Sequence, residues 1–282
     1  MLPSTTAVMT PDGHAFDLAM HGPADAATGL LWLPAMGVPA RKYARFADAL
    51  AQRGIACALH EWRGGGTSTV RASRDIDWSY VQLLRDVDAS RDAAARAAPG
   101  ILWRIGGHSL GAQLAALALA TARDRYDGLV VVGAGLPWWR SFPPWQQPLL
   151  LGVFATFKLL VAACGYFPGD RIGFAGREAR GVIRDWTRSG LTGSYRLDGD
   201  GRNFDAALAV LDAPVEAVHF AQDRYVPAGS LEALVAKLPR ASTRRIELIP
   251  SHFAGGRADH FAWMRDPAPV VDALLRLATP AG

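Results

Sequence analysis

Short apolar runs alternate with longer segments of helical spacing through most of the chain. This alternation is typical of a parallel sheet that is covered by helices. Six apolar runs predict strands of that sheet, and a seventh, Ala15 to Met20, predicts a leading antiparallel strand. The six runs are Leu30 to Leu33, Ile55 to Leu59, Leu102 to Gly106, Leu129 to Val132, Val215 to Phe220 and Arg244 to Ile249.

Five segments between and after these runs carry apolar residues at the spacing of an α-helix. Gly54 follows the first segment and Pro99-Gly100 follows the second, where residues of these types end helices. The predicted helices are Lys42 to Arg53, Tyr80 to Ala97, Leu110 to Arg123, Ser230 to Leu238 and Val270 to Leu277.

One region breaks the alternation, because no clear strand occurs from Pro137 to about Leu211. Its apolar run from Leu149 to Phe167 has about the length of a membrane span, roughly 20 residues. Lys158 lies at the centre of that run, where a charge in lipid is costly. We therefore predict a helical cap at 137–211 over a core formed by 1–136 and 212–282. A membrane span is the weaker alternative, and a lid that contacts lipid stays open.

Composition limits the class of protein. The chain has 282 residues, of which 50% are hydrophobic and 20% charged, so it can bury a sizeable core. Its net charge is +4 without any run of like charges, and we expect no nucleic-acid partner. Cys57 and Cys164 are too far apart in sequence to suggest a metal site or a disulfide framework. The first ten residues lack the pattern of a secretion signal, so we expect a cytoplasmic protein.

The strongest chemical signal is the pentapeptide Gly107 to Gly111, which fits the Gly-x-Ser-x-Gly nucleophile elbow around Ser109. A predicted strand leads into it and a predicted helix leads out. The glycines permit a strained turn with close packing, and the helix N-terminus favours a developing negative charge. We therefore predict Ser109 as a nucleophile.

A serine nucleophile needs a base and an orienting acid, which follow it in the order acid, then histidine. Asp223 comes just after the predicted strand Val215 to Phe220 and is the candidate acid. His252 and His260 both follow the last predicted strand, and spacing alone does not choose between them.

Two backbone N–H groups are needed to bind an oxyanion. We predict Leu110, directly after the nucleophile, and Met36, in the turn after the strand Leu30 to Leu33, with Ala35 as the alternative to Met36. The glycine-rich turn from Arg63 to Ser68 lacks the residues of a phosphate-binding loop and of a dinucleotide site. We therefore expect no cofactor and no metal.

Taken together, these segments resemble the α/β-hydrolase superfamily over most of the chain. The segment Glu61 to Ser68 (EWRGGGTS) resembles its Asp-x-Arg-Gly-x-Gly-x-Ser segment, with Glu in place of Asp. The turn Asp223 to Pro227 resembles its acid-bearing Asp-x-x-Val-Pro turn. The fold implied is a mostly parallel sheet flanked by helices, with a helical cap insertion.

More narrowly, the chain is similar to uncharacterised bacterial predicted hydrolases related to serine-aminopeptidase-like and lysophospholipase-like enzymes. That group tends to carry Gly-His-Phe-Gly-Phe-Phe-Arg around its catalytic histidine. The segment Asp259 to Arg265 (DHFAWMR) matches it at the His, Phe and Arg positions, and this favours His260 over His252. Trp138, Trp139 and Trp186 suit the same group, and we predict that they contact the substrate.

The resemblance implies acyl transfer to water by Ser109, His260 and Asp223 on a small-molecule acyl substrate. A hydrophobic ester is the first hypothesis, because the predicted cap is rich in apolar and aromatic residues. An aminopeptidase or amidase is the second, with Glu178 or Asp185 available for a substrate amine. The third is a member of the fold that binds a ligand without catalysis. The oligomeric state stays open, and contact of the cap with a membrane is a minor alternative.

Overall fold

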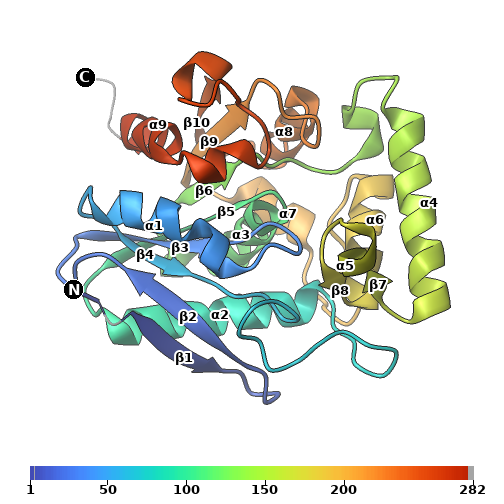
Figure 1. Ribbon diagram of the computed structural model, residues 1–282, viewed down its shortest axis with the longest axis horizontal. Coiled ribbons are helices and arrows are strands. Elements are labelled where there is room, and N and C mark those ends of the chain that lie inside the picture. The colour runs from blue at the N-terminus through green and yellow to red at the C-terminus, as the bar shows by residue number, and fades with distance from the viewer. Residues whose placement is uncertain (3, 279–282) are drawn as a thin grey trace.

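An eight-stranded sheet forms the centre of the protein, described by a computed structural model that covers residues 1–2 and 4–278 (Figure 1). Its strands lie in the order β1-β2-β4-β3-β5-β6-β9-β10. β2 pairs with β1 and β4 in antiparallel fashion, and the other neighbours are parallel. The strands are β1 (Thr5–Met9), β2 (Ala15–His21), β3 (Thr28–Leu33), β4 (Ala56–Leu59), β5 (Leu102–His108), β6 (Leu129–Val132), β9 (Pro214–Phe220) and β10 (Ser242–Leu248).

Helices cover both faces of the sheet, so the predicted fold class is confirmed. Side chains alternate along β3, where Leu31 and Leu33 belong to one apolar cluster and Leu30 and Trp32 to the other. α2 (Tyr80–Ala97), α3 (Leu110–Thr121) and α8 (Ala228–Val235) share the first cluster; α1 (Ala44–Ala51) and α9 (Ala268–Ala278) share the second.

The segment between β6 and β9 forms the cap, at the right of Figure 1. It contains a 3₁₀ turn η3 (Trp139–Ser141), α4 (Gln147–Cys164), β7 (Phe167–Pro168), α5 (Gly169–Ile172), β8 (Arg177–Glu178) and α6 (Arg180–Thr192). β7 and β8 form a short antiparallel ladder that the sequence did not predict. α7 (Phe204–Val210) falls inside the predicted cap, but it packs on α3, and its Phe204 and Leu208 join the core cluster. The range 137–211 therefore contains both the elements around α4 and α6 and one helix that packs on the core.

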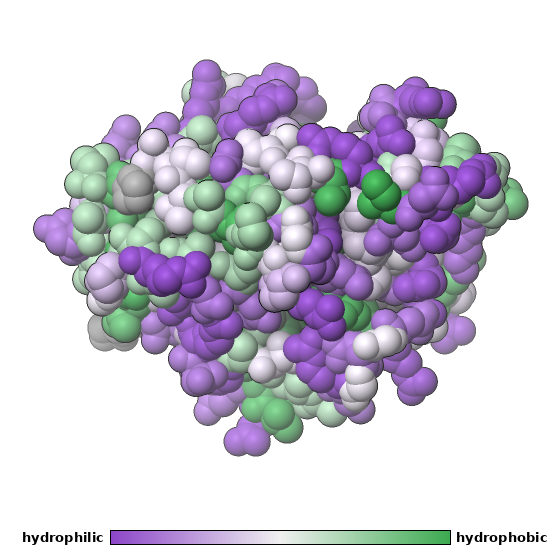
Figure 2. All heavy atoms as spheres, turned by 90° about the horizontal axis from the view of Figure 1, so that it is seen from below, coloured by the Kyte–Doolittle hydropathy of each residue, from purple (hydrophilic) through white to green (hydrophobic). Residues whose placement is uncertain are grey.

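α4 is the one helix in the described part of the chain that is long and apolar enough to cross a membrane, by length and composition alone. Only 17% of its window is buried. Its inward residues Phe154, Phe157 and Val161 pack inside the cap, whereas Leu149 and Leu159 are exposed. On the face drawn in Figure 2, hydrophilic residues (purple) are interrupted by hydrophobic patches (green).

Candidate active site

Ser109 occupies the turn from β5 to α3 with a φ of 56°, a left-handed conformation that is strained for a residue other than glycine. The neighbouring glycines are required by packing. A Cβ on Gly111 would lie 2.0 Å from the carbonyl oxygen of Leu33, and one on Gly107 would lie 2.6 Å from the same atom. The turn thus has the strand–serine–helix geometry that the pentapeptide predicted.

His260 pairs with Asp223, which follows β9. His260 Nδ1 lies 2.7 Å from Asp223 Oδ2, and both side chains are buried. Asp223 Oδ1 also accepts hydrogen bonds from the N–H groups of Tyr225 and Val226, which fix the carboxylate. A proton on Nδ1 leaves Nε2 as the accepting nitrogen of the neutral ring.

His252 is placed differently. It is exposed at the end of a 3₁₀ turn (Pro250–His252), and its Nδ1 accepts a hydrogen bond from the N–H of Ile249. His252 lines neither the cavity that Ser109 and His260 share nor a second cavity beside His260. The structure therefore brings His260, and not His252, to the candidate acid.

Ser109 and His260 both line a cavity of about 450 Å³ between the core and the cap. Its walls are largely apolar, as in sites that bind hydrophobic small molecules. Met36, Leu110 and Trp186 are among the lining residues. Others are Val38, Pro137, Phe142, Trp145, Leu149, Leu150, Val153, Phe174 and Phe261.

Two of the three tryptophans predicted to contact substrate lie outside this cavity. Trp138 packs against the core cluster, and the guanidinium of Arg140 lies over the Trp139 ring. Only Trp186, on α6, lines the cavity. We therefore keep Trp186 as a candidate substrate contact and withdraw Trp138 and Trp139.

The loop after β3 presents one free N–H group to this region. The Ala35 N–H donates to the Tyr43 hydroxyl at 3.0 Å, the Gly37 N–H donates to the Glu178 carboxylate, and the Val38 N–H donates to the Ala35 carbonyl. Among residues 35–38, all of them described, only the Met36 N–H has no protein partner. Of the two candidates from the sequence, Ala35 has its N–H paired and Met36 does not.

Leu110 supplies a second free N–H because it is the first residue of α3, where no intrahelical acceptor exists. Both Leu110 and Met36 line the cavity. Two residues with unpaired N–H groups thus line the same cavity as Ser109, and oxyanion binding requires two such donors.

Two buried side chains that the sequence did not single out for these roles support the loop and the elbow. Burial raises the pKa of Glu178 to about 8, although its hydrogen bond from Gly37 acts in the opposite direction. The Tyr43 hydroxyl oxygen lies 2.9 Å from His108 Nδ1. Burial, together with His260 nearby, holds the pKa of His108 well below its usual range. His108 is therefore a neutral spacer beneath His260, with ring centroids 4.5 Å apart.

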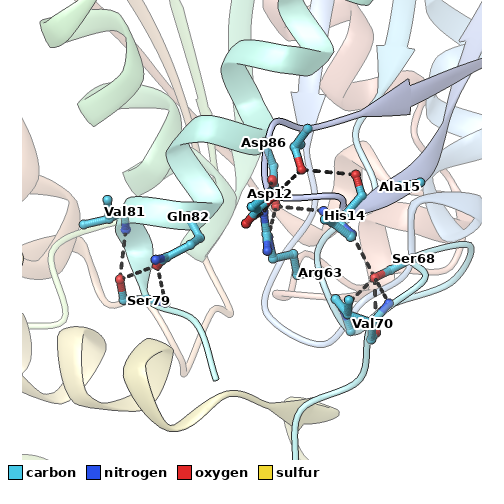
Figure 3. Close-up of polar contacts among 12 residues, drawn as sticks. Asp12, His14, Ala15, Arg63, Ser68, Val70, Ser79, Val81, Gln82 and Asp86 are labelled. Atoms are coloured by element: carbon cyan, nitrogen blue, oxygen red, sulfur yellow. Dashed lines mark hydrogen bonds and ion pairs between the residues drawn. The ribbon is translucent and has the colours of Figure 1, made fainter. Parts of the chain in front are cut away.

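A second serine–histidine–aspartate set lies away from the cavity (Figure 3). Ser68 Oγ is 3.0 Å from His14 Nε2, and His14 Nδ1 is 3.3 Å from Asp86 Oδ2. All three residues are buried, and Arg63 donates two hydrogen bonds to Asp86. None of them lines either cavity, so this set has a structural role.

Among the described residues, no group of three or more His, Cys, Asp or Glu side chains is placed to hold a metal ion. The glycine-rich turn after β4 is filled by the Glu61 carboxylate, since a Cβ on Gly66 would lie 1.8 Å from Glu61 Oε2.

Comparison with known proteins agrees with this geometry. A family model described as serine aminopeptidase, S33, matches residues 29–163, just under half of the chain. That segment includes Ser109, Leu110 and Met36, and excludes Asp223 and His260. No curated protein matches the chain in sequence.

Several solved structures match nearly the whole chain. A hydrolase from Pseudomonas aeruginosa PA01 is 18% identical over 97% of both chains, with a TM-score of 0.62. A bromoperoxidase from Bacillus anthracis is 16% identical over 97% of this chain and 99% of its own, with a TM-score of 0.68. Est1E from Butyrivibrio proteoclasticus, solved with ferulic acid bound, is 15% identical over 96% and 97%, with a TM-score of 0.61. The sheet and these neighbours show that the chain has the α/β-hydrolase fold, and its residues 29–163 are similar to the serine aminopeptidase S33 family.

Proposed function

We propose that the protein is a serine hydrolase that cleaves an ester of a hydrophobic acyl group. Ser109 Oγ attacks the carbonyl carbon while His260 takes its proton, and the N–H groups of Leu110 and Met36 bind the oxyanion. His260 then gives the proton to the leaving alcohol. Water attacks the acyl-serine, His260 again takes and returns a proton, and the acid leaves with Ser109 restored. Asp223 keeps the imidazole oriented throughout, and no step requires a cofactor.

One observation carries this proposal. The strained Ser109 and the buried His260 line one apolar cavity, and His260 Nδ1 lies 2.7 Å from Asp223 Oδ2. In the second serine–histidine–aspartate set, His14 Nδ1 makes no hydrogen bond, and none of the three residues lines either cavity.

An ester fits this cavity better than an aminoacyl substrate does. An aminopeptidase needs a carboxylate near the substrate amine, but the described residues lining the cavity include no Asp or Glu. Glu178 is committed to the Gly37 N–H, and Asp185 accepts a hydrogen bond from the Tyr80 N–H. Both carboxylates are buried, and neither lines the cavity.

Labelling with a fluorophosphonate tests the proposal. The wild-type protein should label, and Ser109→Ala should abolish labelling and turnover of p-nitrophenyl esters. His260→Ala should lower kcat by at least about 10³-fold, whereas His252→Ala should stay within about twofold. Full ester hydrolysis by Ser109→Ala would contradict the mechanism. Binding of acyl ligands without turnover across a broad ester panel would favour the ligand-binding alternative.

A further inference from the structure

A second cavity adjoins the apolar cavity at His260 and is of a different chemical kind. It has a volume of about 830 Å³ and shares five residues with the apolar cavity: Gln146, Arg224, Tyr225, His260 and Phe261. The rest of its wall combines five charged or amide residues, Gln222, Asp223, Arg257, Asp259 and Arg265, with Pro143, Ala221, Pro227 and Ala262. We call it the polar groove.

Three arginines and two aspartates line the polar groove, and both aspartates are already engaged. Asp223 holds His260 and two backbone N–H groups. Asp259 pairs with Arg257 and caps the N–H groups of Phe261 and Ala262. Within the described residues, the guanidinium groups of Arg224 and Arg265 have no acidic partner. The groove therefore offers two exposed cations beside the histidine.

The mechanism fixes which part of an ester can reach this groove. The candidate oxyanion donors, Leu110 and Met36, line only the apolar cavity, so the acyl group belongs there. The leaving oxygen must receive a proton from His260, and it must therefore come within hydrogen-bond reach of that ring. His260 lines both cavities, so the alcohol portion can extend from it into the polar groove.

We infer that the alcohol portion of the substrate carries an anionic group, a carboxylate or a phosphate, that binds Arg224 and Arg265 in the polar groove. Arginine suits both groups because its planar guanidinium matches their oxygens. This inference rests on the proposed function. It also gives a role to Arg265, which belongs to the segment Asp259 to Arg265 but takes no part in the proposed chemistry.

Matched esters of one acyl group test this inference. The probes are the esters formed at the phenolic oxygen of 4-hydroxybenzoate, of 4-hydroxyphenyl phosphate and of the neutral 4-hydroxybenzamide. The kcat/KM of each ester is divided by the rate of its hydrolysis by hydroxide, which corrects for differences in intrinsic reactivity. At low salt, we expect an anionic ester to exceed the neutral one by about tenfold, and 0.5 M NaCl should reduce this ratio. The faster of the two anionic esters identifies carboxylate or phosphate as the preferred group.

The variant Arg224→Gln/Arg265→Gln should bring the ratio of anionic to neutral rates close to one. Arg240→Gln removes an exposed arginine just before β10, at the opposite end of the sheet, and should leave the ratio unchanged. A wild-type ratio near one at low salt, with the neutral ester still hydrolysed, overturns the inference and spares the proposed function.

A binding measurement separates the two ideas if no ester is hydrolysed. Calorimetric titration of the wild-type protein should show that 4-hydroxybenzoate or 4-hydroxyphenyl phosphate binds more tightly than 4-hydroxybenzamide, and that the double variant loses this difference. Such binding without turnover removes the proposed function and keeps the anion site. Equal binding of all three removes the anion site.

Discussion

Tyr43 joins the candidate oxyanion loop to the residue before Ser109. Its hydroxyl accepts the Ala35 N–H and lies 2.9 Å from His108 Nδ1, and its side chain is fully buried. Burial also raises the pKa of Tyr43, so the group stays a neutral hydroxyl.

Tyr43→Phe removes these contacts and leaves the Ala35 N–H unpaired. We expect a loss of about 1–3 kcal/mol in the free energy of unfolding, since an unpaired buried donor costs this much. We also expect kcat to fall about tenfold, less than the 10² to 10³ for loss of a whole oxyanion donor. Urea unfolding and ester kinetics measure both effects.

Tyr80→Phe is the matched control, because the buried Tyr80 hydroxyl has no hydrogen-bond partner in the described part of the chain. Equal losses in both variants would show that the Tyr43 contacts are irrelevant.

Glu178 makes folding depend on pH. Burial raises its pKa from 4.5 to about 8, so between these values the folded state binds more protons than the unfolded state. The contribution of this carboxyl to the free energy of unfolding therefore falls as pH rises from about 4.5 to 8, by at most about 1.4 kcal/mol per pH unit.

Glu178→Gln keeps an oxygen that can accept the Gly37 N–H but cannot ionise. Relative to the wild type, this variant should become progressively more stable from pH 5 to pH 8 and then level off. Urea unfolding at each pH measures the difference, and Glu232→Gln provides a control at an exposed carboxylate. A difference that stays constant across this range would contradict the raised pKa.

At the level of single residues, the sequence predicts what neighbours in the chain determine. Ser109 and its glycines follow from one pentapeptide, and Asp223 from its place after a strand. Tyr43 and Glu178 could not be found in this way, because their roles depend on side chains that meet the loop at 35–37 from distant segments. The opposite case is the set of Ser68, His14 and Asp86. Their residue types and contacts resemble a catalytic set, but their burial denies access to substrate.

The crossing of α4 and α6 is the element-scale feature that shapes the cap. Gly190 on α6 lies against Phe154 on α4, and a Cβ there would meet Phe154 Cζ at 2.2 Å. Phe154 in turn packs edge-on against Trp186, with centroids 5.1 Å apart, and Trp186 lines the apolar cavity.

Gly190→Ala should therefore displace Phe154 and Trp186. We expect a loss of about 1–3 kcal/mol from overpacking, together with a changed acyl-chain preference in a series of p-nitrophenyl esters. Gly152→Ala is the matched control on α4, where a Cβ meets nothing within 4 Å. That variant should be neutral or more stable by up to about 1 kcal/mol, because alanine favours helices. Destabilisation by Gly152→Ala and none by Gly190→Ala would reverse this account of the crossing.

Elements with strong periodicity could be predicted, and elements formed by weak local pattern could not. The buried runs of β3, β4 and β6 are continuous apolar segments, and β5 carries Arg104 within its run. Each predicted run lies within its strand or within one residue of it. β1 was missed because Val8 is its one buried residue, so the sequence shows no alternation. α7 was not predicted, and only tertiary packing assigns its Phe204 and Leu208 to the core cluster.

At the scale of the whole molecule, the sheet order explains why the site lies where it does. Ser109 follows β5, Asp223 follows β9, and Met36 follows β3, so all three leave the carboxyl ends of parallel strands. Ligands of open α/β sheets bind at this edge. Residues between β6 and β9 line the cavity at this edge, and the sequence did not indicate which of their side chains do so.

The exposure of α4 raises the question whether this helix belongs to the cap or to a membrane. Phe157 is buried against Phe167 and Trp186, whereas Leu159 is 71% exposed two residues later. In a membrane span both side chains would lie in hydrocarbon, and an aspartate at either position would be costly. In a cap helix only the inward position is dry.

We therefore expect Phe157→Asp to lower the Tm by about 10 °C, because it loses a buried aromatic side chain and buries a carboxylate among aromatic rings. Leu159→Asp should shift the Tm by less than about 2 °C, because its side chain lies in water. Thermal unfolding of protein purified without detergent measures both. Two results together would establish a membrane span. The wild-type chain would be recovered only in membranes and would resist extraction by an alkaline carbonate wash, and the two variants would impair insertion equally. Unequal changes in Tm would show that the inward side chains of α4 stabilise the folded protein, and that the side chains on its outer face do not.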